Sequence, residues 1–229
     1  MSRKEPMNKT EKRKKILLVD DHPLMRRGQA DLLSREADLS VCGEAGTACE
    51  AMEAIAKLQP DLVLVDMTLP DKNGLELIKD IQALHPGLPV LAMSMQDESL
   101  YAARVLRAGG CGYVMKQEGP ERLAAAIRIV LSGQVALSPR MSAKVLESMV
   151  GPAGEAGGGP EEKLTDRELE LMRLFGEGWS TDEIASRLHL SPKTVDVHRG
   201  HIKEKLGLKN GTELIHYATR WVSEQHNVS

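Results

Sequence analysis

The sequence predicts an α/β domain built on a doubly wound, five-stranded parallel sheet, followed by a small all-α domain of four helices. Short apolar runs alternate five times with segments whose apolar residues recur every three or four positions. A Gly/Pro-rich stretch then interrupts the chain, and helical periodicity alone follows it. Such alternation gives a parallel sheet with helices on both faces, because the crossovers between parallel strands are right-handed.

The predicted strands are nearly continuous in apolar residues, as expected of strands that are buried on both faces. We place them at 16–19, 40–43, 62–65, 90–93 and 112–115. The helices are expected at 24–35, 48–58, 75–84, 100–108 and 121–131. Each has one apolar face, as with Leu75, Ile78 and Ile81.

Polar side chains stand at the C-terminal ends of four strands: Asp20, Asp21, Asp66, Ser94 and Lys116. In open parallel sheets the ligand crevice lies at this edge, so we expect these side chains to converge. Each one alone could equally cap a helix or a turn, since Asp and Ser are common N-caps. Their shared position at matching strand ends favours a site.

Clustered carboxylates raise one another's pKa values unless a cation neutralises them. Oxygen ligands without His or Cys suit Mg²⁺, which leaves room for a phosphate. Asp66 could then act as a nucleophile toward a phosphoryl group, while Lys116 and the Ser94 hydroxyl hold its oxygens. These residue types therefore favour Mg²⁺-dependent phosphoryl chemistry.

Residues 15–132 resemble the receiver domain of two-component response regulators. The resemblance rests on Asp20-Asp21, on Asp66 followed by Leu69-Pro70 and Gly74, on Ser94, and on Gly112-Tyr113-Val114-Met115-Lys116. It implies a flavodoxin-like fold in which Asp66 is the phosphoacceptor and Ser94 and Lys116 bind the phosphoryl group. It also implies Mg²⁺ as the cofactor, held by Asp20, Asp21, Asp66 and the Thr68 backbone carbonyl.

Tyr113 falls at the family's aromatic switch position, although a half-buried strand aromatic is an equal interpretation. Gln117 departs from the family pattern, because many receivers carry a proline after the lysine.

The second domain, 164–229, begins with predicted helix caps. Thr165 with Glu168, and Ser180 with Glu183, have the spacing of capping boxes. Ser191-Pro192 supplies an N-cap and a first-turn proline to a third helix that ends at Gly207. Two helices joined by a tight turn form a helix-turn-helix, and a fourth helix is expected at 213–222.

The third helix carries a basic strip. Between 193 and 209 there are five Lys or Arg residues against two acids, while the whole chain has a net charge of −3. Local positive charge of this kind is typical of phosphate contacts. Residues 164–220 resemble the LuxR-type helix-turn-helix, by the motifs at 164–168, 183–185, 191–198 and 205–207. With the receiver ahead of it, the chain resembles a NarL/FixJ-subfamily response regulator.

The resemblance implies DNA contacts along the third helix. Lys193, Thr194, Arg199 and Lys203 suit phosphate oxygens, and Asp196, Val197 and Gly200 occupy positions that face base edges. His198 is either a phosphate contact or a core residue. The implied partners are a sensor histidine kinase, double-stranded promoter DNA, RNA polymerase and a second copy of the chain, paired through the fourth helix on phosphorylation or on DNA.

Outside the two domains we expect a disordered basic tail at 1–14 and a connecting helix with a Gly/Pro-rich linker at 133–163. No apolar run approaches the ~20 residues needed to span a bilayer. We therefore expect no membrane partner and a cytoplasmic location.

Two other functions would use some of the same residues. A haloacid-dehalogenase-like phosphohydrolase would also use Asp66 and Lys116, but it would carry a second Asp where this chain has Thr68. A regulator that no longer accepts phosphate would lack Asp66, Ser94 or Lys116, and all three are present. The sequence therefore predicts a phosphorylation-dependent transcription regulator that accepts phosphate from a histidine kinase on Asp66 and is not an enzyme.

Overall fold

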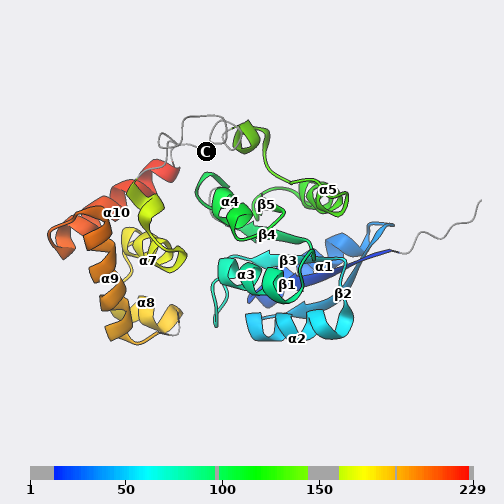
Figure 1. Ribbon diagram of the computed structural model, residues 1–229, viewed down its shortest axis with the longest axis horizontal. Coiled ribbons are helices and arrows are strands. Elements are labelled where there is room, and N and C mark those ends of the chain that lie inside the picture. Colours follow the sequence, from blue (N-terminus) through cyan, green and yellow to red (C-terminus); the bar gives the residue numbers. More distant parts are fainter. Residues whose placement is uncertain (1–12, 96–97, 144–159, 189, 227–229) are drawn as a thin grey trace, which may run out of the picture.

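A computed structural model describes residues 13–95, 98–143, 160–188 and 190–226 (Figure 1). The N-terminal domain is a five-stranded parallel sheet in the order β2-β1-β3-β4-β5. Its strands are β1 (Lys14–Val19), β2 (Leu39–Ala45), β3 (Leu62–Asp66), β4 (Val90–Ser94) and β5 (Gly112–Met115). This order reverses direction at β1, as in doubly wound folds, and confirms the predicted architecture.

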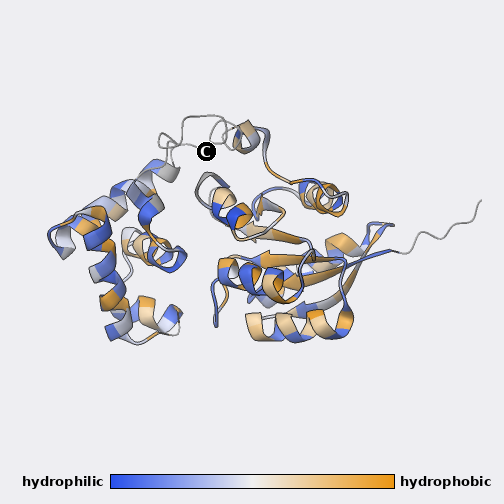
Figure 2. Cartoon of the chain, in the orientation of Figure 1, coloured by the Kyte–Doolittle hydropathy of each residue, from blue (hydrophilic) through white to orange (hydrophobic). Residues whose placement is uncertain are grey.

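Five helices cover the two faces of this sheet. They are α1 (Pro23–Ser34), α2 (Ala48–Leu58), α3 (Gly74–Leu84), α4 (Glu98–Arg107) and α5 (Pro120–Leu131). Buried residues of α1 and α5 share one core with Ile16 and Leu18, whereas α2, α3 and α4 share the other core with Leu17 and Val19. Neighbouring residues of a strand therefore face opposite cores, which explains why the inner strands β3 and β4 are apolar up to their final polar residue (Figure 2).

The first two strands are longer than predicted. β1 begins at Lys14, because the Lys14 N–H donates to the Asp38 carbonyl over 2.8 Å and the Lys15 N–H donates to Asp61 Oδ2 over 2.7 Å. The last residue of the predicted tail thus belongs to the sheet. Residues 1–12 of that tail lie outside the described residues, as do residues 144–159 of the predicted connecting helix and linker.

The C-terminal part consists of a short 3-10 turn, η1 (Pro160–Lys163), and four helices. These are α7 (Asp166–Gly176), α8 (Thr181–Arg187), α9 (Pro192–Leu206) and α10 (Gly211–His226). Both predicted capping boxes are present, at Thr165 and at Ser180, and the Ser191 side chain caps α9. Gly207 ends α9 in the left-handed conformation with φ 68°, where a side chain would be strained.

Helix α10 extends beyond the predicted 213–222 at both ends. Its Leu214, Ala218 and Trp221 are buried in the same core as Phe175 of α7 and Ile202 of α9. In the described part of the chain, no helix is both long enough and apolar enough to cross a membrane.

Candidate functional site

The predicted strand-end residues converge at one edge of the sheet. Lys116 Nζ lies 2.7 Å from Asp20 Oδ2 and 2.7 Å from Asp66 Oδ2. All three side chains are at most 4% exposed. Ser94 closes the same edge as the buried last residue of β4. The structure therefore brings one ammonium group between two buried carboxylates.

Parallel strand pairing sets these residues level with one another. Asp66 is in register with Met93, and Ser94 is in register with Met115. The Lys116 N–H donates to the Ser94 carbonyl over 2.7 Å, which carries the pairing one residue past β5. The convergence is thus a consequence of the backbone ladder.

Gly74 allows the chain to fold back over Asp66. A Cβ atom at this position would lie 2.5 Å from the Asp66 carbonyl oxygen and 2.7 Å from Met67 Cα. Only glycine permits such a close backbone approach. Next to it, Asn73 caps α3 by accepting a hydrogen bond from the Leu75 N–H. The start of α3 is therefore fixed directly beneath Asp66.

The site holds two buried carboxylates, Asp20 and Asp66, with the Lys116 ammonium group between them. Burial raises the pKa of Asp66 to about 6, although Lys116 opposes this rise. Burial alone would lower the pKa of Lys116, but Asp66 and Asp20 outweigh it, and the net shift is upward. A divalent cation would relieve the remaining negative charge.

The donor set fits such a cation. Ligand atoms of Asp20, Asp21, His22 and Asp66 all lie within 4.8 Å of one another. Three of these are carboxylates, which are the ligands that Mg²⁺ prefers. Thr68 lies against this group, because its N–H donates to Asp66 Oδ1 over 3.3 Å. His22 was not singled out from the sequence; its Nδ1 lies 2.6 Å from Asp21 Oδ1, and its side chain is 62% exposed.

Tyr113 is fully buried, not half-buried, and lies in β5 opposite Ala92. It shares the core on the α4 side of the sheet with Tyr101 and Val105. The turn after β5 holds Gln117 without a cis peptide bond, as for every peptide bond of the described residues.

The predicted DNA contacts lie on α9 with different exposures. Lys193, Asp196 and Val197 are exposed, whereas Thr194, Arg199, Gly200 and Lys203 are half-buried. Val195 and Ile202 are buried in the core. His198 is half-buried, and burial together with Arg167 lowers its pKa.

Two of the three predicted cationic contacts on α9, Arg199 and Lys193, differ most in their surroundings. The Arg199 guanidinium lies 5.5 Å above the Phe175 ring, so it packs against the helical core. Lys193, at the N-terminal end of the helix, is exposed to solvent.

A further contact joins the two domains and has no counterpart in the sequence predictions. Arg104 of α4 donates to the carbonyls of Leu164 (2.9 Å) and Glu161 (3.0 Å) and to Asp166 Oδ1 (2.9 Å). Lys79 of α3 pairs with Asp166 as well, over 3.0 Å.

Asn73 adds a third connection, because its amide donates to Glu170 Oε2 over 3.2 Å. These contacts lie on η1 and α7, while Val197 of α9 stays 48% exposed. The receiver therefore holds the C-terminal domain by the helix that packs behind α9.

Comparisons with known proteins match both domains of the chain. The sequence model of the response regulator receiver domain matches residues 16–128, and that of the bacterial regulatory proteins of the luxR family matches residues 162–218. The chain is 37% identical over 207 residues to the DNA-binding transcriptional activator DevR/DosR of Mycobacterium tuberculosis, with 90% of this chain and 94% of that protein covered. It is 33% identical over 210 residues to the oxygen regulatory protein NreC of Staphylococcus carnosus, covering 90% and 97% of the two chains.

A solved structure is also similar. It is RcsB from Salmonella enterica serovar Typhimurium bound to promoter rprA in the presence of the phosphomimetic BeF3⁻, with 27% identity and a TM-score of 0.62. It covers 91% of this chain and 99% of that chain. Sequence and structure thus match over both domains, and the chain belongs to the NarL/FixJ subfamily of two-component response regulators, DNA-binding transcription regulators with a receiver and a LuxR-type helix-turn-helix.

Proposed function

We propose that Asp66 accepts a phosphoryl group from a sensor histidine kinase and that the phosphorylated chain binds promoter DNA as a dimer. The observation that carries this proposal is the position of Lys116 Nζ, 2.7 Å from both Asp20 and Asp66. An Asp66 oxygen attacks the phosphorus while the bond to the kinase's histidine nitrogen breaks. Lys116 and the Ser94 hydroxyl are placed to hold the transferred oxygens.

Asp20, Asp21, Asp66 and the Thr68 carbonyl would hold Mg²⁺, which would neutralise the charge on the carboxylates and phosphoryl oxygens. Because burial raises the pKa of Asp66 to about 6, its nucleophilic form dominates at pH 7 and declines below pH 6. In this reaction the receiver is itself the phosphoryl acceptor, because Asp66 keeps the transferred group. We assign the chain no enzymatic role.

The kinase would dock beside α1 and α5. A groove of about 260 Å³ lies there, lined among others by Met25, Met93, Lys116 and Pro120. Leu24 at its rim is 87% exposed, which is unusual for a leucine and suits a protein contact. Because Lys116 lines this groove, a phosphohistidine bound there would lie next to Asp66.

The DNA-binding surface is α9. Lys193, Thr194 and Lys203 would contact phosphates, and Asp196, Val197 and Gly200 would face base edges. A single helix-turn-helix buries little DNA surface, so two copies on half-sites about one turn apart form the binding unit, paired through α10. A regulator of this kind would contact RNA polymerase at the bound promoter and would work in the cytoplasm.

Since Lys14 belongs to β1, we divide the chain into a tail at 1–13, the receiver at 14–132, a connecting segment at 133–163 and the DNA-binding domain at 164–229. The matched ranges of the two family models, 16–128 and 162–218, support this division.

Electrophoresis that retards phosphorylated protein tests the proposal. Acetyl phosphate with Mg²⁺ should shift the wild-type protein, and the shift should disappear in Asp66→Asn and in excess EDTA. An Asp66→Asn protein that shifts to the same extent would overturn the assignment.

A further inference from the structure

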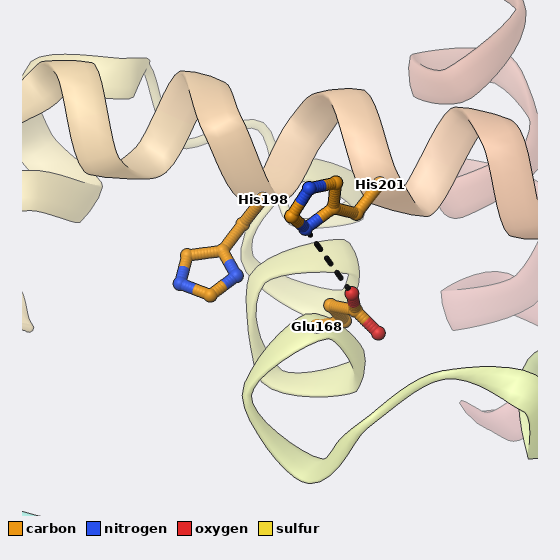
Figure 3. A group of neighbouring side chains, drawn as sticks. All are labelled: Glu168, His198 and His201. Atoms are coloured by element: carbon orange, nitrogen blue, oxygen red, sulfur yellow. Dashed lines mark ion pairs between the residues drawn. The ribbon is translucent and has the colours of Figure 1, made fainter.

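Two histidines of α9 and one glutamate of α7 form a group of metal-binding side chains that no step of the proposed function uses (Figure 3). His198 and His201 are three residues apart, so they share one face of α9. Glu168, in the first turn of α7, faces both. One ligand atom from each of the three lies within 4.8 Å of the others.

The ligand atoms of this group are available. Glu168 Oε2 accepts the Thr165 N–H over 2.7 Å and the Lys205 ammonium over 2.6 Å. Its other oxygen, Oε1, lies 3.8 Å from His201 Nδ1, as the dashed line in Figure 3 marks. The hydrogen bonds to Oε2 thus fix the orientation of the carboxylate, and its Oε1 faces the histidines.

His198 supplies an independent observation. Its Nδ1 atom is buried and has no hydrogen-bond partner among the described residues. A buried nitrogen without a hydrogen-bond partner destabilises the folded state, and a bound ion would offset this cost.

The chemistry of the donors selects the ion. Two imidazole nitrogens and one carboxylate oxygen suit Zn²⁺ and its neighbours in the first transition row, whereas Mg²⁺ prefers oxygen ligands alone. Around a tetrahedral Zn²⁺ the ligand atoms lie about 3.3 Å apart, given bonds of about 2.0 Å. Binding would therefore draw the three ligand atoms together from their present spacing of up to 4.8 Å. We propose that Glu168, His198 and His201 bind a divalent transition-metal ion of the Zn²⁺ class, with water at the fourth position.

Such an ion would tie α7 to the middle of α9. Glu168 is two residues from Asp166, which the receiver holds through Arg104. The ion would therefore connect α9, the DNA-binding helix, to α7, which contacts the receiver through Asp166. It would also keep His198 from contacting a DNA phosphate.

A competition titration of the full-length protein with Zn²⁺ against a chromophoric chelator tests the proposal, in excess Mg²⁺ so that the oxygen site of the receiver is occupied. His201→Gln is the informative variant, because that side chain is 55% exposed and its loss leaves the core intact. The matched control is His216→Gln, which removes an exposed histidine of α10. The wild-type protein and the control should bind Zn²⁺ equally, and His201→Gln should bind it at least about tenfold more weakly.

Visible absorption of the Co²⁺-loaded protein gives a second measurement. Bands of a tetrahedral or five-coordinate ion should appear in wild type and in His216→Gln and disappear in His201→Gln. Equal Zn²⁺ affinity in both variants, equal weakening in both, or a wild-type protein that fails to compete would each overturn the proposal.

Discussion

The acidic site of the receiver and the DNA-binding surface of α9 place charge in opposite ways. In the receiver, Lys116 and the two carboxylates that it contacts are at most 4% exposed. On α9, Lys193 and Asp196 are exposed, and Val197 is 48% exposed. The electrostatic interaction between buried charges is screened only weakly, whereas water and salt weaken the interaction between exposed charges.

This difference in burial predicts which single substitutions have large effects on function. Removing one member of the receiver site leaves the others buried without their partner. Removing one cation from α9 subtracts one contact from several. We therefore expect losses of function in the receiver and graded changes on α9.

The largest effect should follow Lys116→Met. Without the ammonium group Asp20 and Asp66 lose the cation that contacts them both, and the phosphoryl oxygens lose a contact. Phosphorylation by acetyl phosphate should slow by at least about 100-fold, since removal of one such donor costs that much in enzymes. Lys193→Met, a matched loss of an exposed lysine, should leave the rate unchanged. Similar rates for the two variants would remove the distinction between buried and exposed charge.

The next effect concerns stability. Burial raises the pKa of Asp66 from 3.8 to about 6, so the ionised carboxylate costs the folded state about 3 kcal/mol at pH 7. This acid binds its proton more tightly when folded, and the cost therefore disappears as pH falls through 6 toward 4. In EDTA at pH 7, Asp66→Asn should be more stable than wild type toward urea by up to about 3 kcal/mol, and the difference should shrink at pH 4.

Asp71→Asn is the control with the opposite sign. Burial opposes ionisation of Asp71, but the N–H groups of Ala48 and Cys49 outweigh it and lower its pKa. Its replacement should destabilise the protein at pH 7. An Asp66→Asn protein less stable than wild type at pH 7 would show that the bond to Lys116 outweighs the cost of burial.

The receiver site could be predicted from the sequence, whereas the packing around α9 and between the domains could not. Asp20, Asp66, Ser94 and Lys116 were predicted to converge because strand ends meet wherever the sheet is parallel, and the structure confirms that convergence. The position of Arg199 over Phe175 was not predicted, because it depends on how α7 packs against α9. The contact of Arg104 with Asp166 joins residues 62 positions apart, and neither residue type distinguishes it from an ordinary exposed helix.

The contact between the domains should restrain DNA binding. The Arg104 side chain is only 11% exposed and makes three hydrogen bonds to the C-terminal domain. Arg104→Ala should therefore raise the DNA affinity of the unphosphorylated protein by about tenfold, which corresponds to 1.4 kcal/mol.

Lys79→Ala is the control for that variant. Lys79 pairs with the same Asp166, but its side chain is 56% exposed, so its loss should change affinity less than about threefold. Both variants are compared in one titration series at fixed salt. An Arg104→Ala protein that binds DNA as weakly as wild type, while phosphorylation still strengthens both, would show that the contact does not restrain the DNA-binding domain.

The smallest effect should separate two cations of α9 that the sequence treats alike. Lys193 is exposed, whereas the Arg199 guanidinium lies over the Phe175 ring. Lys193→Gln should weaken binding a few-fold on every DNA sequence and reduce the slope of log affinity against log salt by about 0.9, as expected when one phosphate contact is lost. Arg199→Gln removes the same charge but should leave that slope unchanged and lower the stability of the domain by about 1 kcal/mol, because a cation–π contact is lost. Salt titrations of both variants, together with urea unfolding, decide between the two roles. An equal fall in slope for both would show that Arg199 leaves Phe175 on DNA and contacts a phosphate, as the sequence alone predicts.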